Sequence, residues 1–350
     1  MKSKSLYVLS SLAMAAGLVA CGGGGSAGTS LPAAAGGGAV AAPQPVPSPG
    51  VITSTPLVLT VPAPLYAAGS EELAAFNLLN AERARCGFGK MAQSVQLDKA
   101  ARAHNDYQII NNIISHYENF EKFPTGFTGE TWFERVDAAG YKDAGDVIDD
   151  FVRQATLVNK TGFGEIGMHT LLSAPYHMAS LLRGNRDVGV SVRASTDTTP
   201  QGVNPAVFLH VNAAYKINTG PQLIAAGDVA TYPCAGSTGI KSMLDNETPN
   251  PVPGRNLQTN PIGSPVYVLL RQGNLLTITS AKMVETSTNT AIVLRAPVTK
   301  DNDPNFLFRS NEGYVAPDAP LKPMTQHTVE IKGTNNGVAF VSQFQFTTGT

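Results

Sequence analysis

The first half of the chain repeats apolar residues at the three- and four-residue spacing that is typical of amphipathic helices. Ser70 is placed to cap one such helix, and Phe76 and Leu79 lie on its apolar face. In a later helix Ser173 is the expected N-cap, with Pro175 in the first turn. The pattern predicts four helices, over 70–85, 94–111, 129–140 and 173–184.

Farther along, the apolar positions alternate, which is typical of β-strands. Two such runs, 187–193 and 205–215, follow the helices, and this order predicts an α+β fold with an antiparallel sheet. After Gly227 further alternating runs predict an all-β sandwich. The clearest of these are 265–285, with a turn at 272–274, and 327–346, with Asn335-Asn336-Gly337 as its turn.

The N-terminus has the pattern of an export signal. Lys2 and Lys4 precede an apolar run, 6–20, that is too short to span a bilayer as a helix, and Cys21 follows. This pattern resembles the lipobox of bacterial lipoproteins, so we expect cleavage before Cys21 and acylation of the cysteine with chains such as palmitate. A plain secretory signal with an incidental cysteine is the alternative. Lipid would hold the protein to the cell envelope, at the outer membrane if the organism is Gram-negative.

The segment from Cys21 to Ser70 contains no charged residue and is rich in Gly, Ala and Pro, which predicts a tether rather than a packed core. The formal net charge of the full chain is −1, and loss of the two signal-peptide lysines brings it to −3. This balance gives no reason to expect a nucleic-acid partner. Nothing in the sequence predicts an oligomeric state.

With Cys21 carrying lipid, Cys86 and Cys234 remain. In an oxidising compartment two remaining thiols favour a disulfide. Two buried free thiols are the alternative.

The order of short motifs between about 71 and 215 resembles the CAP superfamily, also called the SCP-like extracellular domain. No single motif is specific, but their combined order is. The matches are Leu78-Leu79-Asn80-Ala81-Glu82-Arg83 with Gly87; Leu97, Ala100, Ala101 and His104; Ser115-His116; Arg135 with Ala139-Gly140-Tyr141; Ser173-Ala174-Pro175-Tyr176-His177; and Val188-Gly189-Val190.

The resemblance implies a three-layer α-β-α sandwich with a central cleft. Family members often place two histidines and two glutamates there, and some bind a divalent cation. Carried over, His116 and His177 are the two histidines, and Asp146 takes the position of one glutamate. Glu165 is a poor match for the other. The resemblance therefore implies His116, Asp146 and His177 as candidate cleft residues, and His116 and His177 as ligands of a divalent ion such as Zn²⁺.

The remaining histidines have structural interpretations. His104 is expected to be a hydrogen-bonded helix residue and His169 a loop residue, whereas His210 and His327 are expected in strands. The C-terminal stretch around 321–334 resembles bacterial Ig-like modules. The predicted organisation is a signal peptide (1–20), a tether (21–69), a CAP domain (70–227) and an Ig-like β-sandwich (228–350).

The leading hypothesis is an exported, membrane-anchored lipoprotein that binds a lipid or cell-envelope ligand in a histidine-lined cleft without catalysing a reaction. One alternative is a metal-assisted hydrolase acting on peptide or envelope polymer. A second alternative is a structural spacer or adhesin. No nucleophile motif, P-loop or zinc-protease motif supports other enzyme classes.

Overall fold

The computed structural model describes residues 55–198 and 205–350, which belong to one compact unit. The signal peptide, Cys21 and most of the tether lie outside the described residues. Within the described ranges no helix combines the length and the apolarity that spanning a bilayer requires.

Three of the predicted helix starts are present with local caps. The Ser70 hydroxyl accepts a hydrogen bond from the Leu73 N–H, and Ser94 does the same for Leu97. Thr131 forms a capping box with Glu134. The described helices are α1 Glu71–Arg85, α2 Val95–Asn111, α3 Trp132–Ala138, α4 Phe163–Leu171, α5 Pro175–Leu182 and α6 Ser195–Thr198.

The predicted cap at Ser173 is wrong. Ala174 occupies the N-cap of α5, and the Ser173 hydroxyl donates to the carbonyl of Thr170 instead. The expectation that His169 lies in a loop is also wrong, because the residue belongs to α4, a helix that the sequence pattern did not reveal.

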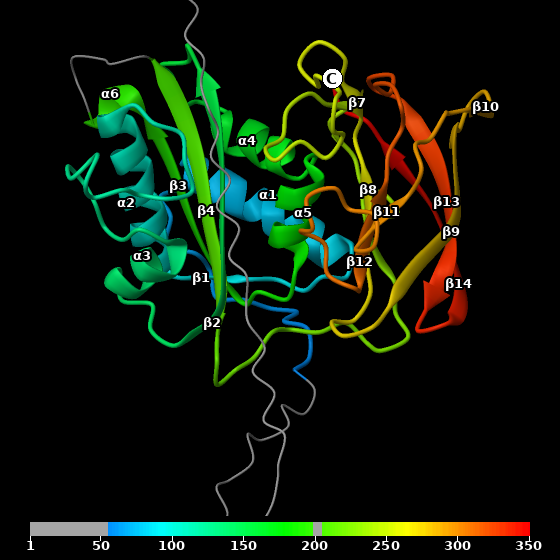
Figure 1. Ribbon diagram of the computed structural model, residues 1–350, viewed down its shortest axis with the longest axis horizontal. Coiled ribbons are helices and arrows are strands. Elements are labelled where there is room, and N and C mark those ends of the chain that lie inside the picture. Colours follow the sequence, from blue (N-terminus) through cyan, green and yellow to red (C-terminus); the bar gives the residue numbers. More distant parts are fainter. Residues whose placement is uncertain (1–54, 199–204) are drawn as a thin grey trace, which may run out of the picture. The chain divides into compact units, whose positions relative to one another are not determined.

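A four-stranded sheet forms the middle layer of the α-β-α region, residues 70–227. Its order is β1-β3-β4-β2, with β1 parallel to β3 and the other pairs antiparallel. Figure 1 shows α2, α3 and α6 on one face and α1, α4 and α5 on the other, which confirms the predicted three layers. The strands are β1 Ala92–Gln93, β2 Ala144–Ala155, β3 Asp187–Ala194 and β4 Ala206–Lys216.

Gly189 allows α2 to lie directly on β3. A Cβ atom at this position would lie 2.1 Å from the backbone of Leu97 and Asp98, closer than any side-chain atom can approach. The glycine of the Val-Gly-Val motif is thus required by packing between helix and strand.

The C-terminal region, residues 228–350, contains two four-stranded antiparallel sheets, β10-β9-β13-β14 and β11-β12-β8-β5, and a small pair, β6-β7. The predicted hairpin at Asn336-Gly337 is confirmed as β13 and β14. The two strands around 272–274 are also present, but each belongs to a different sheet. The relation to Ig-like modules stays a prediction. The strands are β5 Ala230–Tyr232, β6 Met243–Leu244, β7 Ile262–Gly263, β8 Val266–Leu269, β9 Leu276–Glu285, β10 Thr290–Ala291, β11 Val298–Thr299, β12 Glu312–Val315, β13 Gln326–Asn335 and β14 Val338–Thr347.

The two regions share one hydrophobic core, which runs from α1, α4 and α5 into both C-terminal sheets. The predicted disulfide between Cys86 and Cys234 is confirmed and joins the regions covalently. Nearby, the rings of Phe88 and Tyr267 stack at 6.5 Å. The predicted boundary after residue 227 falls between β4 and β5, and side-chain packing continues across it.

Candidate ligand-binding cleft

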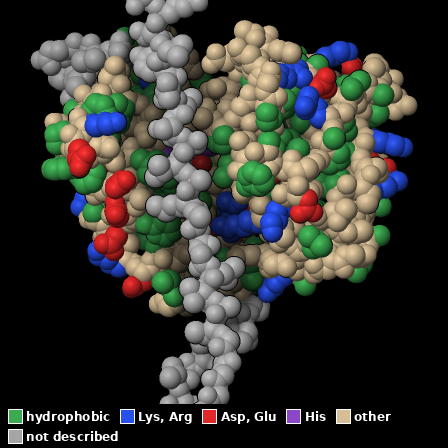
Figure 2. Space-filling view, in the orientation of Figure 1, with side chains coloured by type: hydrophobic (Ala, Val, Ile, Leu, Met, Phe, Trp, Pro, Cys, Tyr) green, Lys and Arg blue, Asp and Glu red, His purple; other side chains and the backbone are tan. Residues whose placement is uncertain are grey.

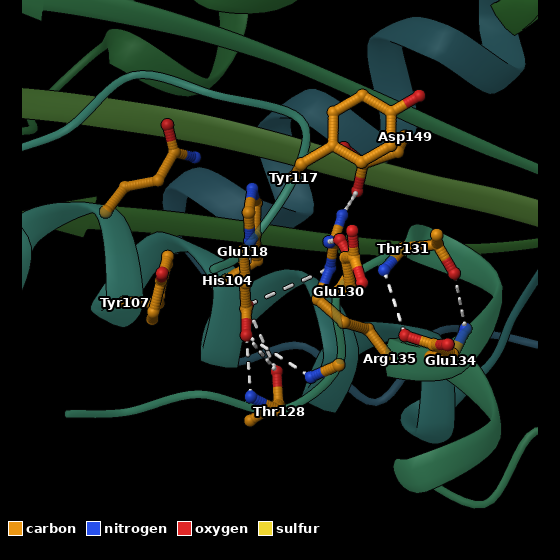
Figure 3. Close-up of polar contacts among 12 residues, drawn as sticks. His104, Tyr107, Tyr117, Glu118, Thr128, Glu130, Thr131, Glu134, Arg135 and Asp149 are labelled. Atoms are coloured by element: carbon orange, nitrogen blue, oxygen red, sulfur yellow. Dashed lines mark hydrogen bonds and ion pairs between the residues drawn. The ribbon is translucent and has the colours of Figure 1, made fainter. Parts of the chain in front are cut away.

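A buried hydrogen-bond network fixes the segment that follows α2. His104, in α2, contacts the Glu118 carboxylate through Nδ1 at 2.9 Å and the Ser115 carbonyl through Nε2 at 2.8 Å. Glu118 also accepts the backbone N–H of Thr128 at 2.6 Å and that of Gly129 at 3.3 Å. Figure 3 draws the hydrogen bonds between Glu118 and Thr128 as dashed lines. The expectation for His104 is confirmed, and the network holds both ends of the loop that carries His116.

Asp149 of β2 is the acid that faces His116. Its Oδ2 lies 2.9 Å from His116 Nδ1, whereas its Oδ1 accepts from Arg135, His210 and Asn212 at 2.7–2.9 Å. The contact with Arg135 is drawn in Figure 3. Burial alone would raise the pKa of the Asp149 carboxyl, but His210, His116 and Arg135 together hold that pKa well below its usual range. Asp149 is therefore a buried carboxylate anion.

His210, in β4 as predicted, is neutral. Burial outweighs the attraction of Asp149 and lowers the pKa of the imidazole to about 4. Its Nε2 contacts Asp149, and its buried Nδ1 has no hydrogen-bond partner in the described part of the chain. A proton on Nε2 is consistent with both facts. Nδ1 then carries a lone pair, and a buried lone pair without a donor is less costly than a buried N–H without an acceptor.

His177, in the first turn of α5, has a different acid partner. Its Nδ1 lies 3.1 Å from Oε1 of Glu247, a fully buried side chain between β6 and β7 of the C-terminal region. Burial would lower the pKa of His177, but the hydrogen bond to Glu247 and the charges of Asp150 and Glu247 raise it overall. Burial raises the pKa of Glu247.

Asp150, next to Asp149, is also buried. Its carboxylate accepts a hydrogen bond from the Ser180 hydroxyl, one turn after His177 in α5. Burial raises the pKa of Asp150 despite the opposing influence of His177 and Ser180. The strand thus presents two adjacent acids whose pKa values shift in opposite directions, downward for Asp149 and upward for Asp150.

These side chains meet at a cavity of about 430 Å³. Tyr117 and Trp132 contribute aromatic walls, with ring centroids 5.3 Å apart, and Tyr117 is about half exposed. The polar groups of the floor come from β2 and α5. The lining consists of His116, Tyr117, Trp132, Val147, Ile148, Asp149, Asp150, Tyr176, His177, Ala179, Ser180, Arg183, Thr248, Pro249 and Leu307.

The structure places His116 and His177 on the same cavity but not the third candidate. The Asp146 carboxylate bonds Arg309 at 2.9 Å and the Val147 N–H at 3.0 Å, and the residue is not part of the lining. Glu165 is exposed on α4, also outside the lining. The sequence comparison missed Asp149, Asp150, Ser180 and Glu247. Adjacent aspartates within the apolar run 147–152 are the signal that could have found the first two.

The described side chains do not supply a complete ligand set for a zinc ion. Zinc sites usually provide three or four protein ligands. Within residues 55–198 and 205–350, no three His, Cys, Asp or Glu side chains come together as a metal-binding group. The carboxylates of Asp149 and Glu247 contact Nδ1 of His116 and His177, which is also how acids orient metal-bound histidines, so the role of the two histidines as metal ligands stays a prediction.

Charged side chains are unevenly distributed over the surface. Figure 2 shows most Asp and Glu side chains of the visible face toward its left edge and a group of Lys and Arg side chains near its centre, although the formal net charge of the full chain is only −1.

Residues 76–206 match the family model of the cysteine-rich secretory protein family, CAP. This chain contains a CAP domain. No curated protein matches the chain.

The solved structures that are similar to the chain include the following two. One is an outer surface protein of Borrelia burgdorferi, at 12% identity and a TM-score of 0.32, with coverage of 43% of this chain and 96% of that chain. The other is an extracellular protein containing a SCP domain from Bacillus anthracis, at 20% identity and a TM-score of 0.32. That comparison covers 42% of this chain and 40% of the other. The CAP match places both candidate histidines, His116 and His177, inside the domain.

Proposed function

We propose that this protein is an exported, lipid-anchored protein of the cell envelope whose CAP domain binds an amphiphilic ligand, a lipid with an acyl chain, without transforming it. One observation supports this most strongly: the cavity of about 430 Å³ has aromatic and aliphatic walls and a hydrogen-bonding floor. Its volume falls within the range of about 300–1,000 Å³ that is usual for small-molecule sites.

The polar floor suits the head of such a ligand. His116 and His177 each use Nδ1 on a carboxylate, so Nε2 is the ring nitrogen left for a bound molecule. Ser180 adds a hydroxyl. The apolar walls, among them Ile148 and Leu307, then cover the chain of the ligand.

Trp132 provides a direct assay. It is the only tryptophan in the sequence, and it lines the cavity. We suggest using residues 21–350 with Cys21→Ser, because a chain without lipid can be purified without detergent. This protein is then titrated with the fluorescent fatty acid cis-parinaric acid. Saturable energy transfer from Trp132 to the probe, reversed by oleic acid, is expected. Absence of saturable transfer would contradict the proposal.

A matched pair of variants locates the site. Leu307 lines the cavity and is 44% exposed, whereas Leu275 is 53% exposed and lies outside the lining. Leu307→Ser removes part of an apolar wall. Because full burial of a leucine side chain contributes about 1.5–3 kcal/mol, covering the partly exposed Leu307 contributes less, and we expect its loss to lower the affinity several-fold. Leu275→Ser should leave the affinity unchanged.

The hydrolase remains the second candidate because both histidines have a carboxylate on Nδ1, an arrangement that also orients a general base. Incubation of the protein with a peptide library and with purified peptidoglycan, followed by mass spectrometry, tests it. Products that disappear in both His116→Ala and His177→Ala would favour the hydrolase. Retention of intact peptidoglycan by the protein, without parinaric acid binding, would favour an envelope polymer as ligand.

The anchor has a separate test. Mass spectrometry of the N-terminal peptide from the membrane fraction should find Cys21 as the first residue, with acyl chains attached. The Cys21→Ala variant should not be processed in this way. An unmodified Cys21 in a soluble mature protein would show a plain secretory signal instead.

A further inference from the structure

The N-terminus of α5 depends on a residue from the C-terminal region. Ala174 is the N-cap of this helix and has no side chain that can accept a hydrogen bond. Glu247 Oε1 accepts the N–H groups of Tyr176 at 2.8 Å and His177 at 3.3 Å instead. One carboxylate therefore takes the place of the missing cap.

The same oxygen holds the imidazole ring. Because His177 Nδ1 lies 3.1 Å from Glu247 Oε1, the ring is fixed with Nδ1 turned away from the ligand and Nε2 available to it. Asp150, hydrogen-bonded to Ser180, is the other acid that faces this ring. Among the described residues, Glu247 alone is hydrogen-bonded to the ring.

The residues that follow Glu247 continue into the cavity. Thr248 and Pro249 line it, and Leu307, also of the C-terminal region, completes that side. This side is held against α5 by two contacts, one buried and one partly buried. The Tyr176 hydroxyl donates to Asp303 at 2.5 Å, and Arg183 forms a two-pronged ion pair with Glu312 at 2.7 Å.

We propose that the ligand binds between the CAP domain and the C-terminal region, with Glu247 as the positioning residue of His177 and Thr248, Pro249 and Leu307 as the second wall. The place of the ligand in this inference rests on the proposed function, binding of a lipid. The positioning role of Glu247 does not depend on the identity of the ligand. The C-terminal region is thus part of the binding site rather than a spacer.

The positioning role has a spectroscopic signature. Long-range ¹H–¹⁵N spectra of the histidine side chains distinguish a proton on Nδ1 from one on Nε2. In the wild type, His177 should carry its proton on Nδ1. Glu247→Ala should remove the preference of the proton for Nδ1. Glu247→Gln should retain part of this preference, because the amide carbonyl oxygen still accepts a hydrogen bond. The protonation pattern of the His116 ring should not change in either variant. Glu330→Ala, an acid on β13 paired with Lys332, is the control.

Probe binding tests the second wall. With cis-parinaric acid and Trp132 as the reporter, Glu247→Ala should weaken binding by about five-fold or more, the loss of one charge-assisted contact. Thr248 is exposed at the cavity, so Thr248→Phe narrows it without disturbing a core and should also weaken binding. The matched control is Thr277→Phe, at an exposed position of β9.

The outcomes separate the two proposals. If the wild type does not bind the probe, the ligand class is wrong, and the ¹⁵N spectra still decide the role of Glu247. If the wild type binds but Thr248→Phe binds equally well, the second wall is refuted. An unchanged His177 signature in both Glu247 variants would overturn the positioning role, and if Glu247→Ala does not fold, Glu247→Gln decides.

Discussion

Replacement of Asp149 by asparagine tests the interpretation of this carboxylate as a buried anion that is stabilised by the Arg135 guanidinium and by uncharged hydrogen-bond donors. Three donors converge on its Oδ1: Arg135, His210 and Asn212, all buried. An asparagine carbonyl keeps the geometry of these bonds but removes the charge. A second acid, Glu118, lies 4.0 Å from Arg135 and compensates its charge only in part.

The expected cost follows from these contacts. A hydrogen bond to a charged group contributes about 1.5–3 kcal/mol and a neutral one about 0.5–1.5 kcal/mol. Loss of the charge at three bonds therefore lowers the free energy of unfolding by about 3–4 kcal/mol, close to the cost of breaking a buried ion pair. Urea denaturation followed by Trp132 fluorescence measures it. The control is Asp137→Asn: its carboxylate is 59% exposed in a pair with Lys142, so the change should stay within about 0.5 kcal/mol.

The pH dependence gives a second check. Because the folded-state pKa of Asp149 is depressed, its stabilisation is fully present above the unfolded pKa and is lost as the pH falls through the folded pKa. The difference between wild type and Asp149→Asn should stay constant from about pH 5 to 8 and shrink below about pH 4. The reasoning would be refuted if the two free energies of unfolding differed by less than about 1 kcal/mol at neutral pH, or if their difference did not shrink at acidic pH.

Three further predictions follow from other parts of the structure. The double variant Cys86→Ser/Cys234→Ser should lose up to about 4–5 kcal/mol of stability, and the wild type in reductant should match it in urea denaturation. Gly189→Ala should lower the free energy of unfolding by about 1–3 kcal/mol, because its Cβ would overlap the backbone of α2. Gly227→Ala should leave that free energy unchanged, because nothing lies within 4 Å of its Cβ position. NMR titration should place the pKa of His177 above 6.5. The contribution of this histidine to stability is then present below pH 6.5 and is lost as the pH rises through the pKa of the folded state. A pKa below 6.5 would contradict the contact between His177 and Glu247.

Local signals in the sequence were sufficient at several places where the structure satisfies a polar group locally. The caps at Ser70 and Ser94 are examples, because the hydroxyl and the N–H that it accepts lie three residues apart. The turn at Asn336-Gly337 is another, because both residues adopt positive φ, which Asn and Gly tolerate. The family motifs located His116 and His177 for the same reason, since each lies within a short stretch of recognisable residues.

Long-range packing explains two of the elements that the pattern missed, β2 and α4. The strand β2 is buried along its middle on both faces, so it lacks a clean alternation, and Asp149 and Asp150 interrupt its apolar run. The helix α4 contains Gly164 and Gly167, which lower helix propensity. Both glycines face close neighbours: Gly164 lies against the Glu71 carbonyl and Gly167 against Leu209. Tertiary packing selects these residues, and a single sequence does not show which neighbour does so.

The starts of α4 and α5 show what a sequence could still have revealed. Gly162 and Ala174 occupy their N-caps, and neither has a side chain that can accept a hydrogen bond. The first N–H groups of a helix must nevertheless find acceptors. In both helices a distant carboxylate supplies one: Glu71 bonds the N–H of Gly162 and Gly164, and Glu247 bonds the start of α5. At α5 that acid, Glu247, also joins the C-terminal region to His177.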